Sequence, residues 1–180
     1  LTSATKSNGI AITMPYWDER VEAMAKNYPD IKWDKYHIDI LSALFVLRPD
    51  KFNVVVASNL FGDILSDLGP ACIGTIGIAP SGNINPDRIY PSVFEPVHGS
   101  APDIAGKGIA NPTGIILSAG MLLEWLGVRH AKESYLAAAQ AIHEAVDSAL
   151  ADRTVCTGDL KGGGNTRAFG ERVVKNVRKG

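Results

Sequence analysis

Apolar residues along the chain recur with two different periods, which alternate from one segment to the next. Trp17, Val21, Met24 and Tyr28 follow one another at intervals of three or four residues, which is the spacing of one face of an α-helix. Pro15 is typical of the first turn of a helix. We therefore expect an amphipathic helix that begins near Pro15 and ends at the Asn-Tyr-Pro-Asp sequence around Tyr28.

A continuous apolar run occupies residues 52–57. A run of this length is typical of a β-strand that is buried on both faces. The next segment has the period of a helix and ends near Gly69 and Pro70. In open α/β sheets, ligands bind beyond the carboxyl ends of the strands, where a strand meets its following helix. This junction is therefore the first place to look for a functional site.

The remaining segments continue the alternation of strands and helices, which predicts an α/β fold. They are a strand over 31–37, a helix over 38–47 stopped by Pro49, an extended segment over 89–97, a helix over 112–126 closed by Gly127, a helix over 131–150, and a last helix that runs through Val177 after a glycine-rich turn. Residues 74–87 are rich in glycine, proline and asparagine, so we expect a loop there.

The composition excludes several classes of protein. Hydrophobic residues make up 46% of the chain and charged residues 21%, with a formal net charge of −1, which is unlike a disordered or nucleic-acid-binding chain. The apolar stretch over 114–126 is too short to span a bilayer. Cys72 and Cys156 form no metal-binding or disulfide pattern, so a cytoplasmic protein is expected. The chain begins at Leu1 with no initiator methionine, which suggests the interior of a longer protein.

Asp63 and Asp67 lie four residues apart, within the helix that follows the buried strand. Side chains at this spacing project from the same helix face, and two carboxylates there can bind a hard divalent cation such as Mg²⁺ or Mn²⁺. The alternative is that they offset the helix dipole in the first turn. Asp39, at a strand-to-helix junction, is similarly either a helix cap or a third acidic ligand.

Two further features could take part in catalysis or ligand binding. Lys6 is expected just past a strand, and a lysine can act as a general base when burial or a nearby cation lowers its pKa; the alternative is a solvated surface charge. Residues 98–111 are rich in small residues that let backbone amides approach a ligand, and Asp103 there could accept hydrogen bonds from ribose hydroxyls. The alternative is an ordinary surface loop. Neither a Gly-x-Gly-x-x-Gly fingerprint nor a P-loop is present.

The order and spacing of these motifs resemble the β-decarboxylating dehydrogenases, the family of isocitrate, isopropylmalate, and tartrate or D-malate dehydrogenases. The motifs that carry the resemblance are Lys6-Ser-Asn8, Asp39, Asn59-Leu-Phe-Gly-Asp-Ile-Leu-Ser-Asp67, and the sequence Phe94-Glu-Pro-Val-His-Gly-Ser-Ala-Pro-Asp103-Ile-Ala-Gly-Lys-Gly-Ile-Ala-Asn111-Pro112. The first ten residues and residues 79–86 look most like the tartrate/D-malate branch.

The resemblance implies a metal-assisted oxidation. In such an enzyme Asp63 and Asp67 would bind Mg²⁺ or Mn²⁺ in one subunit, and Asp39 would be contributed by the other subunit of a homodimer. Lys6 would take the proton of the substrate hydroxyl, with Asp39 as the second catalytic residue. The substrate would be a 2-hydroxy dicarboxylic acid, which loses carbon dioxide after oxidation. A monovalent cation is a further possible cofactor.

The resemblance also implies how a nicotinamide cofactor is bound. Asn8 would lie near the nicotinamide and the substrate. The other cofactor residues would come from the motif that ends in Pro112: Glu95, His98, Gly99, Ser100, Ala101, Asp103 and Asn111. NADP-using members of the family carry Lys-Tyr where this chain has Asp103-Ile104, and a carboxylate would repel the extra phosphate of NADP. NAD is therefore the expected cofactor.

Members of the family are about twice this length, so the resemblance implies the carboxyl-terminal half of an isopropylmalate-dehydrogenase-like fold, which is not a Rossmann fold. Residues 1–73 would belong to the metal, substrate and dimerisation domain, and residues 74–180 to the cofactor-binding domain. Exposed apolar faces are expected, and the chain alone is expected to be insoluble or inactive. The alternatives are an isopropylmalate or isocitrate dehydrogenase, and an inactive fragment or non-catalytic subunit; no nucleic acid or membrane partner is expected.

Overall fold

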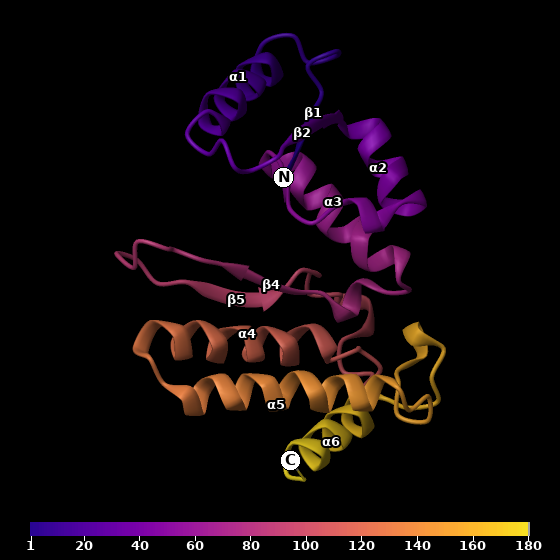
Figure 1. Ribbon diagram of the computed structural model, residues 1–180. Coiled ribbons are helices and arrows are strands. Elements are labelled where there is room, and N and C mark those ends of the chain that lie inside the picture. Colours follow the sequence, from indigo (N-terminus) through magenta and orange to yellow (C-terminus); the bar gives the residue numbers. More distant parts are fainter. Residues whose placement is uncertain (180) are drawn as a thin grey trace. The chain divides into compact units, whose positions relative to one another are not determined.

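The computed structural model describes residues 1–179 and divides into two compact units, Leu1–Ile73 and Gly74–Gly180. Each unit has its own core and is described by itself (Figure 1). Strands and helices are both present in each unit. The fold is therefore of the mixed α/β class that the alternation of periods predicts.

The first unit is a small parallel sheet with three helices. Its strands are β1 (Thr2–Thr5), β2 (Asp34–His37) and β3 (Val55–Val56), and its helices are α1 (Thr13–Ala25), α2 (Ile38–Leu47) and α3 (Asn59–Cys72). The strand order is β2-β1-β3, and both pairings of the central strand are parallel. Because all three strands run the same way, their carboxyl ends meet at one edge of the sheet.

The core of this unit forms between the sheet, α2 and α3. Ala4 and Leu41 are completely buried, and Phe61 and Leu65 of α3 are 5% exposed. The ring of Phe52 lies 5.3 Å from that of Phe45. Burial of this kind stabilises a fold by roughly 1.5–3 kcal/mol for each large side chain, so it fixes the two helices against the sheet.

The expectation of a strand buried on both faces is wrong for residues 52–57. Only Val55 and Val56 pair in a sheet, and Val54 is 60% exposed. Within the first unit, this segment borders an apolar hollow of about 590 Å³. That hollow is lined by Leu1, Val21, Met24, Ala25, Tyr28, Ile31, Trp33, Val54, Val55, Val56 and Ala57.

The ends of three other elements differ from expectation in this unit. Helix α1 ends at Ala25 because the amides of Asn27 and Tyr28 turn back to the carbonyls three residues earlier. Strand β2 begins only at Asp34, where pairing with Thr2 starts. Helix α3 continues two residues past Pro70, because a proline near the end of a helix removes only one amide donor.

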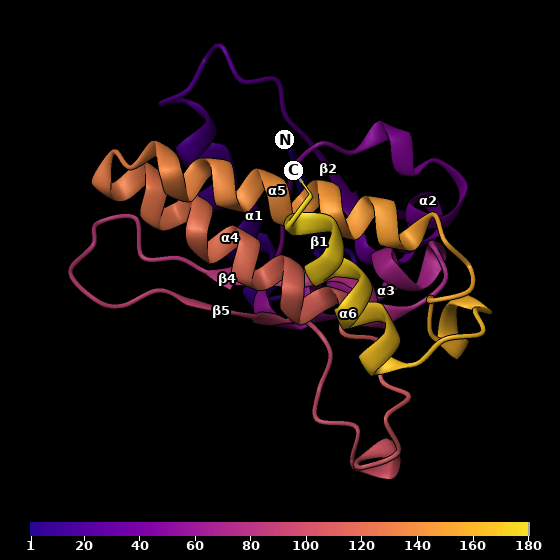
Figure 2. The ribbon, with the colours of Figure 1, turned by 90° about the horizontal axis from the view of Figure 1, so that it is seen from below.

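The second unit is an antiparallel β-ribbon on a stack of helices. Its strands are β4 (Pro80–Asn83) and β5 (Val93–Pro96), and its helices are α4 (Thr113–His130), α5 (Glu133–Leu150) and α6 (Thr166–Val177). The ribbon lies on one side of α4 and α5 on the other, and α6 crosses α5 (Figures 1 and 2). Phe169 of α6 and Val146 of α5 are completely buried in the core of this unit.

Two expectations are wrong in the second unit. The segment 74–87 was expected to be a loop, but Pro80–Asn83 pairs with β5, and this pairing overrides a composition poor in strand-forming residues. Gly127 was expected to close α4, but the helix continues to His130 and ends where Ala131 takes a left-handed conformation with φ 50°. Gly127 is instead buried where α4 passes close to Leu136 of α5.

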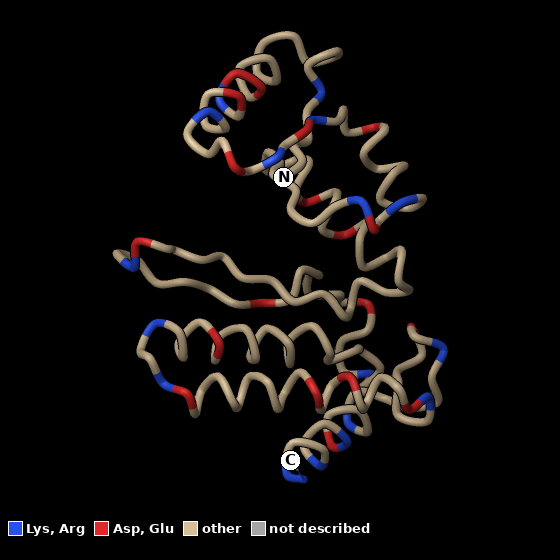
Figure 3. Tube along the Cα trace, in the orientation of Figure 1, with Lys and Arg blue, Asp and Glu red and all other residues tan. Residues whose placement is uncertain are grey.

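Basic and acidic residues are scattered over both units, and between Lys51 and Arg88 the charged residues are all acidic (Figure 3). None of the helices in residues 1–179 has both the length and the apolar character needed to cross a lipid bilayer.

Candidate functional site

Three of the residues singled out from the sequence lie beyond the carboxyl edge of the parallel sheet. Lys6 directly follows β1, Asp39 is the second residue of α2 after β2, and Asp63 lies in α3 after β3. The register aligns Thr5 with His37 and Ser3 with Val56. The topology thus brings residues that are far apart in the sequence to one edge of the sheet, where α/β proteins hold ligands.

Lys6 and Asp39 form a direct ion pair. The Lys6 Nζ atom donates to Asp39 Oδ1 at 3.0 Å, and the two side chains are 29% and 63% exposed. The hydrogen bond from Lys6 holds the pKa of Asp39 below its ordinary value, and the backbone amides of Asp39 and Ile40 act in the same direction. Asp39 therefore interacts with the start of α2 and also presents a charged carboxylate next to the lysine.

The backbone around Lys6 forms a tight turn. The carbonyl oxygen of Lys6 accepts hydrogen bonds from the amides of Gly9 and Ile10, at 2.9 and 2.8 Å. Asn8 lies in this turn and is exposed. The turn fixes the direction in which the lysine leaves the sheet, so its amine stays near α2.

Asp63 and Asp67 lie on the exposed side of α3, whereas Phe61 and Leu65 are buried. Asp63 is the fifth residue of the helix, and the first turn holds no acidic residue. The helix-dipole alternative therefore does not explain these carboxylates, since the dipole acts mainly within the first turn. Neither carboxylate forms an ion pair with another described residue.

The chemistry of this donor set fits part of a site for Mg²⁺ or Mn²⁺, because both ions prefer carboxylate oxygens. Across residues 1–179, however, no three His, Cys, Asp or Glu side chains are close enough together to hold a metal ion. The described chain thus presents two carboxylates on α3 and a separate lysine–aspartate pair.

Asp18 was not singled out from the sequence, although it is the only charged residue among the buried ones that the structure describes. It is 8% exposed, and its Oδ2 atom accepts a hydrogen bond from Lys35 at 3.1 Å. Burial raises the pKa of Asp18, but the hydroxyl groups of Thr5 and Ser7 and the amine of Lys35 outweigh this and lower it. Asp18 thus anchors Lys35 of β2 to α1.

The glycine-rich segment between β5 and α4 extends away from the helices (Figure 2). His98 Nδ1 lies 2.9 Å from the carbonyl oxygen of Gly99, and Ala101 takes a left-handed conformation before the 3₁₀ turn Pro102–Ile104. The predicted cofactor residues Glu95, Gly99, Ser100, Ala101 and Asp103 are exposed in this segment or just before it.

At the start of α4, whose N-cap residue is Pro112, the Asn111 side chain bonds to the helix backbone. Its Oδ1 atom accepts a hydrogen bond from the amide of Thr113, the first residue of α4, at 3.0 Å. Its Nδ2 atom donates to Asp159 Oδ2 at 3.0 Å. Asp159 was missed in the sequence because it lies 48 residues further along, in a segment with no recognisable motif.

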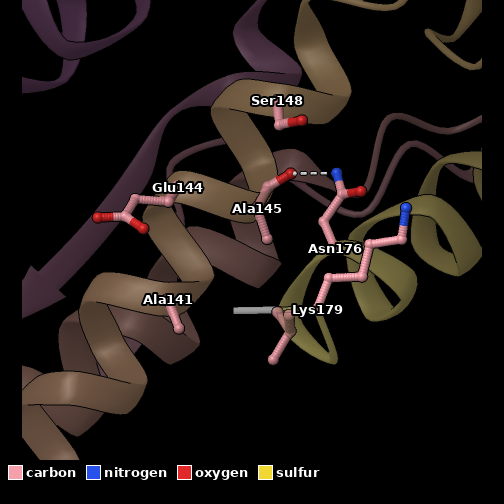
Figure 4. A pocket seen from close by; sticks show the side chains of 7 residues that line it. Ala141, Glu144, Ala145, Ser148, Asn176 and Lys179 are labelled. Atoms are coloured by element: carbon pink, nitrogen blue, oxygen red, sulfur yellow. Dashed lines mark hydrogen bonds between the residues drawn. The ribbon is translucent and has the colours of Figure 1, made fainter.

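A hollow of about 330 Å³ lies between α5 and α6 (Figure 4). It is lined by Ala141, Glu144, Ala145, Ser148, Asn176, Val177 and Lys179. The Asn176 side chain donates to the carbonyl oxygen of Ala145 at 3.1 Å and so joins the two helices. None of the residues predicted to bind metal or cofactor is among the residues that line it.

Comparison with known proteins decides the family. A family model described as isocitrate/isopropylmalate dehydrogenase matches residues 1–173. The chain belongs to this family. The resemblance of the Lys6, Asp63 and Phe94 motifs is thereby confirmed, over nearly the whole chain.

Individual members of the isocitrate/isopropylmalate dehydrogenase family support the branch that the sequence indicated. The chain is 61% identical to the decarboxylating D-malate dehydrogenase of Escherichia coli (strain K12) over 177 residues, which is 98% of this chain and 48% of the relative. It is 60% identical to the tartrate dehydrogenase/decarboxylase of Pseudomonas putida over 180 residues, covering 99% of this chain and 48% of the relative. The chain therefore spans about half the length of these relatives.

A solved structure confirms the fold. The crystal structure of isocitrate dehydrogenase from Methylococcus capsulatus superimposes with a TM-score of 0.87 at 40% identity, covering 98% of this chain and 50% of that chain. The expected α/β, isopropylmalate-dehydrogenase-like fold is thus correct for the part of the family fold that this chain represents.

Proposed function

We propose that this chain contributes the Lys6, Asp39, Asp63 and Asp67 functional groups to an NAD-dependent dehydrogenase that oxidises and decarboxylates a 2-hydroxy dicarboxylic acid such as tartrate or D-malate. The observation that carries the proposal is the ion pair of Lys6 with Asp39. It lies at the carboxyl edge of the parallel sheet, and strand β3 of the same sheet is followed by α3, which carries Asp63 and Asp67. The D-malate and tartrate activities named for the relatives support the substrate class.

The metal site is shared between two protomers in this proposal. Asp63 and Asp67 of one protomer bind Mg²⁺ or Mn²⁺ together with Asp39 of the second. Two observations support sharing: one protomer assembles no three-residue acidic group within its described residues, and α2 and α3 expose apolar side chains that a second copy would cover. The exposed apolar residues on these helices are Ile40, Val46, Leu47, Leu60 and Ile64.

Lys6 and Asp39 belong to the same protomer in this shared site, because they form an ion pair within one chain. A bound divalent cation would lower the pKa of the substrate hydroxyl and offset the negative charge that develops as carbon dioxide leaves. Only the neutral amine of Lys6 can accept the hydroxyl proton at Nζ, and a divalent cation bound nearby would favour that neutral form by repelling the ammonium. Asp39 would keep the amine at the site through the 3.0 Å contact. A bound nicotinamide would supply the hydride acceptor for the substrate carbon, and Asn8 in the Lys6 turn would help to hold it.

The segment between β5 and α4 binds the cofactor in this proposal. Its exposed backbone and its positive-φ residues Ala101, Gly106 and Gly108 allow close approach of a ligand. Asp103 accepts hydrogen bonds from ribose hydroxyls and disfavours the 2′-phosphate of NADP. NAD is therefore the proposed cofactor, and Gly74–Gly180 the cofactor-binding unit, with Leu1–Ile73 as the metal, substrate and dimerisation unit.

The alternatives keep the chemistry but change the substrate to 3-isopropylmalate or isocitrate. A non-catalytic subunit is disfavoured because the base and all three acidic residues are present in the chain. A cytoplasmic location stays a prediction from the cysteine usage.

The test is an assay of the full-length enzyme, meaning residues 1–180 together with the other half of the fold that the relatives contain. D-malate, tartrate, 3-isopropylmalate and isocitrate are each offered with NAD or NADP, in the presence of Mn²⁺ and K⁺, and NADH formation is followed by absorbance. We expect turnover of D-malate or tartrate with NAD, abolished by excess chelator. Undiminished turnover in chelator would contradict the proposal, and a preference for 3-isopropylmalate or isocitrate would move it to the alternative substrate.

A further inference from the structure

The carboxylate of Asp159 joins three segments of the second unit that are far apart in the sequence. Its Oδ2 atom accepts hydrogen bonds from the Thr75 hydroxyl at 2.6 Å and from Asn111 Nδ2 at 3.0 Å, and its Oδ1 atom accepts one from the Thr157 hydroxyl at 2.5 Å. These donors precede the 3₁₀ turn Ile76–Ile78, helix α4 and the 3₁₀ turn Gly158–Leu160, respectively. The carboxylate thus holds the starts of two 3₁₀ turns and of helix α4 close together.

The Asn111 amide is held from both ends as a result. Its oxygen accepts from the amide of Thr113, and its nitrogen donates to Asp159. Reversing the amide would place a donor against the Thr113 N–H and an acceptor against the carboxylate, so the two contacts fix its orientation. One N–H of Nδ2 and one lone pair of Oδ1 are then left for another partner.

Close packing and charge strengthen this arrangement. A β-carbon at Gly77 would lie 2.9 Å from Asn111 Cβ and 3.4 Å from Asp159 Oδ2, so a glycine is needed for the three segments to meet. Burial raises the pKa of Asp159, but the hydrogen bonds from Thr157, Thr75 and Asn111 outweigh it and lower the pKa. The acceptor facing Asn111 is therefore an ionised carboxylate, which makes a stronger hydrogen bond than a neutral group.

We infer that Asp159 is a positioning residue for cofactor binding, which orients the Asn111 side chain so that its remaining donor and acceptor face the nicotinamide dinucleotide. The inference rests on the proposed function, in which Asn111 contacts the cofactor. Asp159 acts only through Asn111 and does not itself touch the cofactor or the substrate.

The experiment measures NADH binding to the full-length enzyme by fluorescence titration, together with kcat and the KM for NAD. Asp159→Asn replaces the charged acceptor with an amide of the same size. We expect the Kd for NADH and the KM for NAD to rise about tenfold, as for a lost hydrogen bond to a charged group, whereas kcat stays within about twofold. The double variant with Asn111→Ala should bind NADH no more weakly than Asn111→Ala alone, because nothing is left to orient.

Asp152→Asn is the matched control. Asp152 lies in the same segment and also accepts hydrogen bonds, from Thr154 and Arg172, but has no contact with Asn111. It should lower thermal stability and leave the Kd for NADH unchanged. Should Asp159→Asn fail to fold, Thr157→Val removes one hydrogen bond to the Asp159 carboxylate instead. We expect the Kd for NADH to rise about threefold. This rise should disappear when Asn111 is also replaced by alanine.

The outcomes separate this inference from the proposed function. An unaltered enzyme that does not bind NADH overturns both. Normal NADH binding by the unaltered enzyme and an unchanged Kd in Asp159→Asn overturn only the role of Asp159. The same holds if the effects of Asp159→Asn and Asn111→Ala multiply in the double variant, because Asp159 then acts independently of Asn111.

Discussion

Single carboxylates are central to the proposed function, and their environments differ in ways that the sequence does not reveal. Asp63 and Asp67 are exposed on α3 with no ion-pair partner among the described residues, whereas Asp39 is paired with Lys6 and Asp18 is buried. Exposed, unpaired carboxylates are able to bind a cation without first breaking another contact. This difference is the physical reason for assigning the primary metal ligands to α3.

Replacement of Asp63 tests that assignment directly. Asp63→Asn keeps the shape of the side chain but removes its charge, so Mn²⁺ affinity and kcat/KM of the full-length enzyme should each fall by at least about a hundredfold. The measurements are metal titration of the rate and equilibrium dialysis with Mn²⁺. Asp50→Asn is the control: Asp50 is an exposed aspartate of the same unit that pairs only with Arg48, and its loss should change neither quantity. Equal effects of the two substitutions would show that α3 has no special role.

Elements were predictable where local patterns decide them. The helix over 38–47 was predicted with its observed bounds, because an apolar run bounded by Pro49 leaves the chain few alternatives. The last helix begins after Asn165, whose side chain accepts from the amide of Ala168 and caps it. Strand β4 and the continuation of α4 past Gly127 depend instead on pairing with β5 and packing against α5. Neither contact has a local signal.

The same limit applies to the candidate site. Lys6, Asp39 and the α3 carboxylates were found from the spacing of motifs, and the parallel topology then explains why three strand ends converge. Asp18 and Asp159 were missed because most of their contacts are distant along the chain: Lys35 lies 17 residues from Asp18, and Asn111 and Thr75 lie 48 and 84 residues from Asp159. A carboxylate that accepts from hydroxyls in distant turns looks like any surface aspartate in the sequence.

Gly127 provides a test at the level of one helix pair. A β-carbon there would lie 2.7 Å from Leu136 Cδ2 and 3.2 Å from the Leu136 backbone nitrogen, so Gly127→Ala must push α4 and α5 apart. We expect the free energy of unfolding to fall by about 1–3 kcal/mol despite the better helix propensity of alanine. Gly170→Ala in α6 is the control, since nothing lies within 4 Å of its β-carbon; it should stabilise the enzyme by about 0.5–1 kcal/mol. Denaturant unfolding of both variants measures the difference, and a stabilised Gly127→Ala would show that the close helix contact is absent in solution.

At the scale of the whole molecule, the ion pair of Lys6 with Asp39 determines how a shared site must be divided between two protomers. The two residues lie within hydrogen-bonding distance in one chain, so they belong to the same half of the site. Asp63 and Asp67 form the other half on α3. The proposed homodimer would therefore have two sites, each with the lysine–aspartate pair from one protomer and the helix carboxylates from the other.

Mixing inactive variants tests this division. Co-refolding Lys6→Ala with Asp63→Asn should restore about a quarter of the wild-type activity, because half of the random dimers are mixed and each mixed dimer has one intact site. Lys6→Ala mixed with Asp39→Asn should restore none, because every site then lacks either the amine or the carboxylate of the pair. Recovery in the second mixture would place Lys6 and Asp39 on opposite sides of the interface. Failure of the first, in dimers shown to be mixed, would mean that each protomer builds its site from its own residues.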